Sequence, residues 1–115
     1  MLRLFVLAML AFCGPALALT VTDGSASGLP QDEAAKIIDI LSIRPDMKAE
    51  AEVSGLRAAG GDPHIYCGML SEYGVSVPMM IDTYAGVSYV LWDTLEGDQR
   101  NDVQARVGAY GCIPQ

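Results

Sequence analysis

The sequence is poor in histidine, cysteine and basic residues, and each shortage excludes a class of site. Its 115 residues include one histidine, three cysteines and seven Lys and Arg, against fourteen Asp and Glu. A zinc site takes three or four close ligands of the Cys or His type. Binding to DNA, RNA or anionic lipid depends on clustered Lys and Arg. We therefore expect no metal, no cofactor and no nucleic acid partner.

Long apolar runs are also missing after residue 18, so we expect no membrane span in the rest of the chain. The chain opens MLRLFVLAMLAFCGPALALT, in which Arg3 precedes an apolar run that ends at Cys13, and small residues follow to Ala18. These are the three regions of a secretory signal peptide. We expect cleavage near Ala18 and a periplasmic or secreted protein. Phe12 stands where a lipidation signal has a small residue, so Cys13 is expected to leave with the leader.

Export would leave two cysteines, Cys67 and Cys112, in a compartment that oxidises thiols. An even number of cysteines in a small exported domain is most simply explained by a disulfide. This bridge closes a loop of about 46 residues, for which the chain-entropy model gives about 4 kcal/mol of stabilisation. The remaining chain of about 97 residues is long enough for one small domain, and its net charge is near −8.

Residues 19–29 are small and polar and predict a flexible lead-in, and residues 30–115 predict a single globular domain. The first element of this domain is a helix in LPQDEAAKIIDILSI. Pro30 suits a first helical position, and Asp32 and Glu33 complement the positive end of the helix dipole. An apolar stripe at helical spacing predicts one buried face, formed by Ala34, Ile37, Ile38 and Leu41.

Alternation of apolar and polar residues predicts strands in the middle of the chain. The segment MKAEAEVSGL alternates from its first residue, Met47, and HIYCGML places Ile65 and Cys67 on one face and His64 on the other. VSVPMMID and VSYVLW complete the sheet. Pro78 predicts an edge strand or a bulge because it cannot donate to a ladder.

The last element is a helix that Asp98 can cap, with Asp102 and Arg106 spaced for an ion pair. Its buried stripe is expected to be Val103, Val107 and Tyr110.

Together the elements predict an α+β fold: an N-terminal helix, a three- or four-stranded antiparallel sheet, and a C-terminal helix stapled by the disulfide. The alternative is an all-α bundle, because paired prolines and glycines can mark helix ends. A helical stripe then fits Ile81, Tyr84, Ala85, Ser88, Trp92 and Leu95.

The central strands have a distinctive order: PDMKAEAEVSGLRA, then YCG, then a glycine turn leading into VPMMI. It covers about residues 45 to 82, and Cys67, Gly68 and Gly74 are its distinctive positions. The order resembles a group of small exported bacterial proteins of unknown function. In these, a strand is followed by a second strand bearing Cys-Gly, a glycine-containing turn and an apolar strand. The resemblance implies a mixed α+β shape and carries over no activity.

The single histidine raises the question of a catalytic dyad of His64 and Cys67. Three strand positions put these side chains on opposite faces and about 10 Å apart along the strand. A disulfide would also remove the thiolate. We therefore expect no catalytic residue here.

Acidic residues cluster between positions 93 and 102, and they suggest two further kinds of site. Asp93, Glu96, Asp98 and Asp102 lack the alternating oxygens and the closing glutamate of a calcium loop. Asp82, Asp93 and Glu96 provide carboxyls that glycoside hydrolysis would use in pairs, as almost any acidic protein does.

The last candidate site is a group of Met and aromatic residues within fourteen positions of the chain. Adaptable Met and amphipathic aromatic side chains are typical of recognition patches. If helices cover both faces of the sheet, these residues are part of the hydrophobic core. If one face is open, that face can bind a partner. The candidate interaction surface consists of Met79, Met80, Tyr84, Tyr89 and Trp92.

The sequence favours a non-catalytic binding or inhibitor-like module of the cell envelope, with an envelope protein as partner. Two alternatives stay open. One is a small carboxylate-dependent hydrolase, and the other is an acid-stress chaperone-like all-α protein, suggested by the acidic composition and the single bridge.

Overall fold

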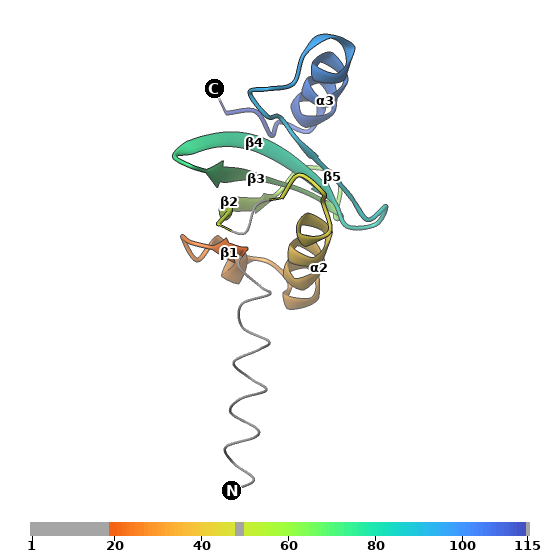
Figure 1. Cartoon of the computed structure of the whole chain (residues 1–115). Coiled ribbons are helices and arrows are strands. Elements are labelled where there is room, and N and C mark those ends of the chain that lie inside the picture. The colour runs from red at the N-terminus through yellow and green to blue at the C-terminus, as the bar shows by residue number, and fades with distance from the viewer. Residues whose placement is uncertain (1–18, 48–49, 115) are drawn as a thin grey trace, which may run out of the picture.

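The computed structural model describes residues 19–47 and 50–114. The predicted leader, residues 1–18, lies outside the described residues, so its cleavage and the export of the protein stay predictions. In chain order the elements are β1 (Thr20–Val21), η2 (Ser25–Gly28), α2 (Gln31–Ser42), β2 (Glu52–Ala58), β3 (Ile65–Glu72), β4 (Val75–Asp82), β5 (Val87–Val90) and α3 (Gly97–Ala109). Figure 1 shows one sheet between two helices, with α2 on one face and α3 on the other.

The five strands form a mixed sheet in the order β1-β2-β3-β4-β5. β1 runs parallel to β2, and all other neighbours are antiparallel. The α+β class, the two helices and the disulfide are therefore confirmed. The prediction of three or four antiparallel strands is wrong, because a parallel strand joins the edge of the sheet. The all-α alternative is also wrong, so the chaperone-like alternative loses the all-α fold that was expected with it, and its function stays a prediction.

Residues 19–29, predicted as a flexible lead-in, belong to the fold. Val21 of β1 lies beside Val53 of β2, and the Ser25 hydroxyl accepts a hydrogen bond from the Leu56 amide at 3.0 Å. A strand of two residues is too short to show an alternating pattern, so periodicity cannot reveal it.

Element boundaries differ from the sequence patterns by a few residues. Pro30 is the N-cap of α2 and not its first residue, and its carbonyl accepts the Ala34 amide at 2.9 Å. β2 begins at Glu52, later than the start of the alternation at residue 47. Asp98, predicted as a cap, lies in the first turn of α3.

A bulge in β2 departs from simple alternation. The register against β3 shifts within the strand. At this point Gly55 has a φ of 62°, which favours glycine, and its amide donates to the Asp23 carboxylate at 2.8 Å. The extra residue lets Val53 and Leu56 enter the same core although they are three positions apart.

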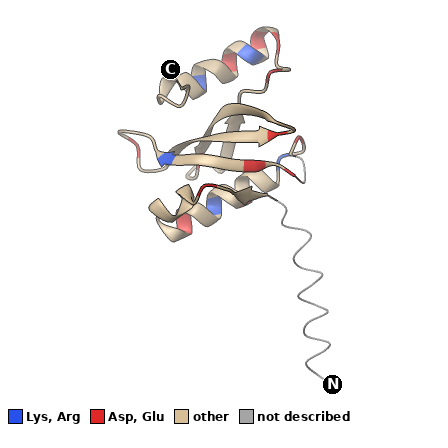
Figure 2. Ribbon diagram, turned by 90° about the vertical axis from the view of Figure 1, so that its left-hand side faces the viewer, with Lys and Arg blue, Asp and Glu red and all other residues tan. Residues whose placement is uncertain are grey.

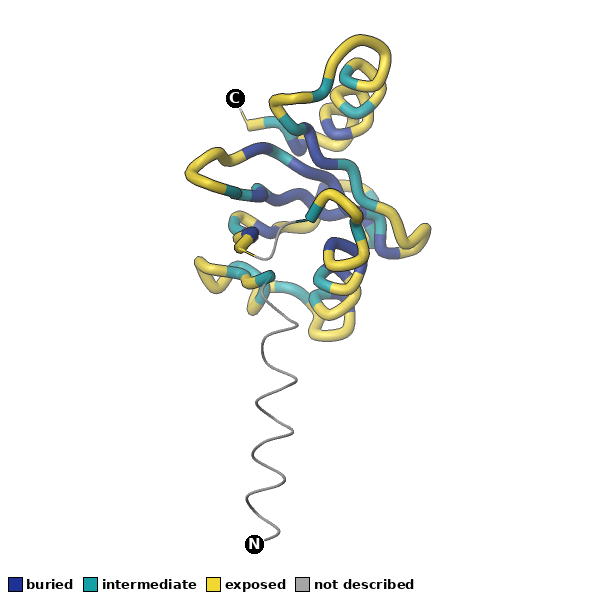
Figure 3. The backbone as a smooth tube through the Cα atoms, viewed as in Figure 1, coloured by how far each residue is buried: buried dark blue, intermediate teal, exposed yellow. Residues whose placement is uncertain are grey.

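Consecutive residues of the central strands are buried, as their dark blue colour in Figure 3 shows, so both faces of the sheet are covered. The alternation predicted for β3 is confirmed, because Ile65 and Cys67 lie in the core under α3 and Tyr66 lies in the core under α2. The α2 core contains Ile37, Ile40, Leu41, Ala51, Val53, Leu56, Tyr66, Leu70, Val77, Met79, Ile81 and Val90. The smaller α3 core contains Ala59, Ile65, Cys67, Met80, Val107 and Cys112.

Pro78, predicted to mark an edge strand or a bulge, lies in an internal strand whose pairing with β3 has no register shift. β4 lies between β3 and β5, and Met79 pairs with Val90, the last residue of β5. One step further the Pro78 carbonyl accepts the Leu91 amide at 3.0 Å, and the proline ring has no N–H to return. β5 therefore ends where Pro78 cannot donate.

The outer edge of β5 is occupied by side-chain and turn contacts. Arg44 donates to the Ser88 carbonyl at 2.8 Å and binds both carboxylate oxygens of Asp46, at 2.8 and 2.7 Å. The Trp92 indole donates to Asp46 at 2.8 Å, and the Trp92 amide donates to the Val90 carbonyl at 3.0 Å. These contacts engage carbonyls that an added strand would need.

Few buried residues of α3 hold it to the sheet. Val107 is its one buried residue, whereas Val103 is partly buried and Tyr110, which follows the helix, is 39% exposed. The disulfide between Cys67 and Cys112 joins β3 to the segment after α3. Since the predicted apolar stripe of α3 is mostly not buried, the disulfide contributes much of the attachment of α3 to the sheet.

Basic residues are spread over the described part of the chain, as the blue segments of the ribbon in Figure 2 show. They lie on both helices, on β2 and in the loop after α2: Lys36, Arg44, Arg57, Arg100 and Arg106.

Within residues 19–47 and 50–114, no helix is long and apolar enough to cross a membrane.

Replacing Cys67 and Cys112 together by Ala should lower the free energy of unfolding by about 2 to 4 kcal/mol, because the unfolded chain loses its cross-link. Urea unfolding measures this loss. Hydrogen exchange should show that amides of α3 lose more protection than amides of α2, because α2 packs on the larger core. Equal loss over both helices would contradict the special dependence of α3 on the bridge.

Candidate functional site

The five residues predicted as an interaction surface do not share a face. Met79 and Met80 are buried on opposite faces of β4, with 0% and 4% exposure. Trp92 packs against the α2 core and Tyr89 against the α3 core. Tyr84 is 84% exposed after β4. Helices cover both faces, so Met79 lies wholly in the core, whereas Met80 is nearly buried on the face that α3 covers.

The structure instead brings together four polar residues that the sequence patterns did not connect. We call them the Glu33 cluster: Glu33 of α2, His64 before β3, Tyr66 of β3 and Thr83 after β4. Oε1 of Glu33 accepts hydrogen bonds from the Thr83 hydroxyl at 2.8 Å and the Tyr66 hydroxyl at 3.2 Å, and it lies 3.2 Å from Nδ1 of His64. The cluster therefore ties α2 to the ends of two strands.

Glu33 is nearly buried, and its surroundings keep it ionised. The residue is 7% exposed, and Oε2 lies 3.3 Å from the Lys36 ammonium. The hydrogen bond from Thr83 is the largest cause that lowers the pKa of Glu33 from 4.5 to about 2, and contacts with His64, Lys36 and Tyr66 add to it against the opposing effect of burial. Burial, followed by the charge of Glu33, raises the pKa of Tyr66, so this phenol stays a donor.

His64 is oriented by the ionised Glu33. A carboxylate can only accept hydrogen bonds, so a neutral His64 ring carries its proton on Nδ1 and keeps an acceptor lone pair on Nε2. Cys67 lies in the core on the opposite face of the sheet and is bound to Cys112. The structure therefore separates His64 from Cys67, as the strand spacing predicted.

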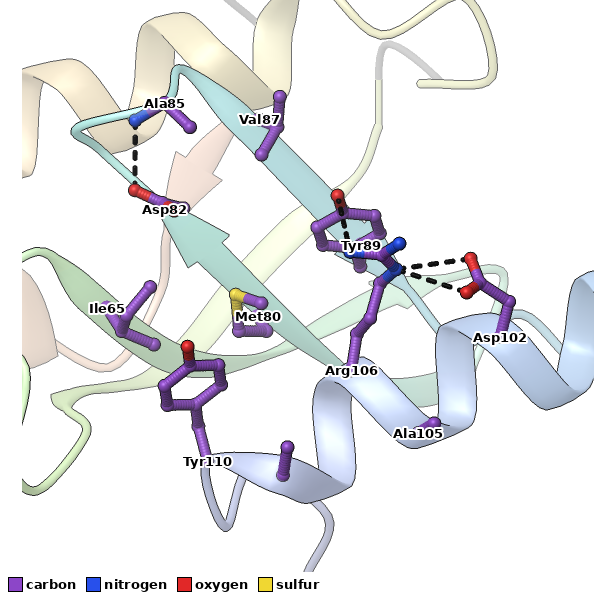
Figure 4. Close-up of a pocket in the computed structure, with 11 residues that line it drawn as sticks. Ile65, Met80, Asp82, Ala85, Val87, Tyr89, Asp102, Ala105, Arg106 and Tyr110 are labelled. Atoms are coloured by element: carbon purple, nitrogen blue, oxygen red, sulfur yellow. Dashed lines mark hydrogen bonds and ion pairs between the residues drawn. The ribbon is translucent and has the colours of Figure 1, made fainter.

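A groove of about 490 Å³ lies between α3 and the sheet, and we call it the α3–β5 groove (Figure 4). The buried side chains of Ile65 and Met80 lie at its base. Tyr89 lines it from β5, and the small residues Ala105 and Ala109 line it from α3. The groove exists because these alanines are too short to fill the space between the helix and the sheet.

The two ends of the α3–β5 groove differ. At one end Arg106 pairs with Asp102 at 3.2 Å, as their spacing predicted, and its guanidinium lies 4.9 Å from the centroid of the Tyr89 ring. At the other end lie the carboxylate of Asp82 and the side chain of Val87, which is 38% exposed (Figure 4). This second end offers apolar surface beside a negative charge.

A smaller hollow of about 280 Å³ adjoins the groove, and we call it the turn hollow. It is lined by Asp62, His64, Asp82 and Tyr84, and Asp82 also lines the groove. Oδ1 of Asp62 accepts the His64 amide at 2.9 Å, and Oδ1 of Asp82 accepts the amides of Tyr84 and Ala85 at 3.0 Å each. Among the described residues no ion pair involves Asp62 or Asp82.

The other acidic residues considered in the sequence do not converge on one point. Asp82 lies at the end of β5 that begins with Val87, whereas Asp93 and Glu96 follow the opposite end of this strand. In the part of the chain that the structure describes, no group of three or more His, Cys, Asp and Glu residues is placed to hold a metal ion. The carboxyls proposed for hydrolysis are therefore not brought together.

Sequence reasoning missed Glu33 because it was assigned to the helix dipole. Glu33 lies four positions before Ile37 and seven before Ile40, so it shares the buried face of α2. A carboxylate on an apolar stripe indicates a buried polar partner. The spacing of Glu33 from Ile37 and Ile40 therefore indicates that this carboxylate is buried.

Comparisons with known proteins give no match to this chain, whether with family models, curated proteins or solved structures. The resemblance of residues 45 to 82 to small exported bacterial proteins stays a prediction.

Replacing Glu33 by Gln should lower the free energy of unfolding at pH 7 by about 1 to 3 kcal/mol, because three donors lose a charged acceptor. Since folding lowers the pKa of Glu33 from 4.5 to about 2, the unfolded state binds more protons between these values. The stabilisation is complete above about pH 4.5 and is lost as the pH falls toward 2.

Urea unfolding of both proteins at several pH values measures the effect, and the difference between them should shrink below pH 4.5. The replacement of exposed Asp39 by Asn, on the same helix, is the matched control. A difference that does not change with pH would show that the charge of Glu33 does not stabilise the fold.

Proposed function

We propose that this protein is a non-catalytic binding or inhibitor-like module of the bacterial envelope that holds a segment of a partner polypeptide in the α3–β5 groove. One observation carries the proposal. The groove combines a buried apolar base, an aromatic wall and charged ends within about 490 Å³. Apolar depressions with aromatic rims and a few polar groups are typical of recognition sites.

An apolar side chain of the partner is the chemistry that the groove fits. It would lie on Ile65 and Met80, between Tyr89 and the two alanines of α3. Full burial of one aliphatic or aromatic side chain contributes about 1.5 to 3 kcal/mol. The flexible thioether of Met80 adapts to side chains of different shape. The groove therefore supports recognition of an apolar anchor in a peptide segment.

The envelope location is supported by two features. The first eighteen residues have the regions of a secretory leader. The disulfide between Cys67 and Cys112 is compatible with an oxidising compartment, where such bonds persist. An envelope protein is accordingly the proposed partner.

Panning of displayed random peptides on the oxidised full-length protein should enrich peptides with a shared apolar anchor. Replacing Ala105 by Trp should weaken their binding at least about tenfold, equivalent to about 1.4 kcal/mol, because the indole fills the groove. Fluorescence anisotropy with labelled enriched peptides measures the dissociation constants.

The matched control replaces Gln104 by Trp, which adds the same side chain to an exposed position of α3 that does not line the groove. Its peptide affinity should equal that of the unmodified protein. Peptides that bind the Ala105→Trp and Gln104→Trp proteins equally well would place binding outside the groove and contradict the proposal.

A further inference from the structure

The turn hollow presents hydrogen-bond acceptors and an aromatic ring to a ligand. Asp62 and Asp82 use Oδ1 for backbone bonds of the turns, which leaves Oδ2 of each carboxylate to accept from a ligand. The Tyr84 ring is 84% exposed, and its centroid lies 5.7 Å from that of His64. Acceptors beside an aromatic face are the surroundings that a cation prefers.

The Glu33 cluster holds a second ring at the turn hollow, that of His64. Nδ1 of His64 lies 3.2 Å from the buried Glu33 carboxylate, and the His64 ring lines the turn hollow. The side chain of Glu33 is only 9% exposed, and it is held by Thr83 and Tyr66 as well. The orientation of His64 is thus fixed from inside the protein and not by the exposed turn.

Charge complementarity selects among the ligands that could occupy the turn hollow. The chain has a formal net charge of −7, and no ion pair of the described residues neutralises Asp62 or Asp82. A guanidinium is planar and carries five N–H donors, so it can bind carboxylates and lie against an aromatic ring at the same time. An ammonium offers fewer directions and stacks less well.

We infer that the turn hollow binds the guanidinium of an Arg side chain from the same partner segment whose apolar anchor lies in the α3–β5 groove. This inference rests on the proposed function. Asp82 lines both depressions, so a short segment reaches both. The protein therefore recognises an Arg close in sequence to an apolar residue.

Peptides enriched on the oxidised full-length protein should carry Arg within a few positions of the apolar anchor. Replacing Asp62 or Asp82 by Asn should weaken their binding about tenfold each, which corresponds to about 1.4 kcal/mol. Asn retains an oxygen that can accept the amides of the turns, so the fold is preserved. Circular dichroism and the midpoint of thermal unfolding check this preservation.

The replacement of Asp39 by Asn is the control, because it removes one negative charge from an exposed position of α2 that lines neither the turn hollow nor the α3–β5 groove. Its affinity should stay within twofold of the unmodified protein at 0.15 M salt, where distant charges are screened over about 8 Å. A second control replaces the Arg of the peptide by Met. This peptide should bind the unmodified protein and the Asp62→Asn, Asp82→Asn and Asp39→Asn variants with equal affinity.

The outcomes separate the inference from the proposed function. If groove filling by Ala105→Trp abolishes binding but the peptides lack Arg, or the Asp62 and Asp82 variants match Asp39→Asn, the Arg site is refuted and the groove stands. If Lys peptides bind as tightly as Arg peptides, the guanidinium assignment is wrong. If Ala105→Trp has no effect, the proposed function fails, and the inference fails with it.

Discussion

The disulfide between Cys67 and Cys112 is the constraint on which the arrangement of α3 depends. α3 buries only Val107, and a helix with so little buried apolar surface has little tendency to stay on a sheet by itself. The covalent bond fixes the end of the helix at β3, and the small side chains of Ala105 and Ala109 leave a space between α3 and the sheet. The α3–β5 groove is the space that results.

The opposite face of the sheet is organised by noncovalent contacts. The α2 core is larger, and Glu33 adds a polar connection from α2 to Thr83 and Tyr66. Buried polar groups with satisfied partners rigidify the elements that they join. The two helices thus differ: α2 is anchored by a large core and by hydrogen bonds, whereas α3 has one buried residue, Val107, and the disulfide that follows it. The proposed recognition surface lies under the second helix.

Much of this architecture follows from local patterns in the sequence. The alternation around Ile65 and Cys67 predicts β3 and its two buried faces, and the helical period predicts α2. The expected export and the number of cysteines together predict the bridge between Cys67 and Cys112. These features depend on neighbours within one element or on a count of residues.

The features that the sequence concealed depend on contacts between distant elements. β1 has two residues and acquires its strand conformation only beside β2. The candidate surface was assembled from residues close in the chain, but Met79 and Met80 point to opposite cores. Similarly, Glu33 and Thr83 are fifty positions apart and meet only after the sheet has formed. Sequence patterns within single helices or strands do not reveal contacts between different elements.

The occupied edge of β5 restricts how any partner can attach. Arg44 binds the carbonyl of Ser88, and the amide of Trp92 binds that of Val90. A polypeptide that extends the sheet by β-augmentation would have to displace both contacts before it gained a ladder of its own. Main-chain pairing of this kind is largely indifferent to sequence, whereas contact with the face of a sheet is made through side chains. At this edge, therefore, neither a partner strand nor a second copy of the chain could pair without displacing these contacts, and a partner would have to be recognised through its side chains.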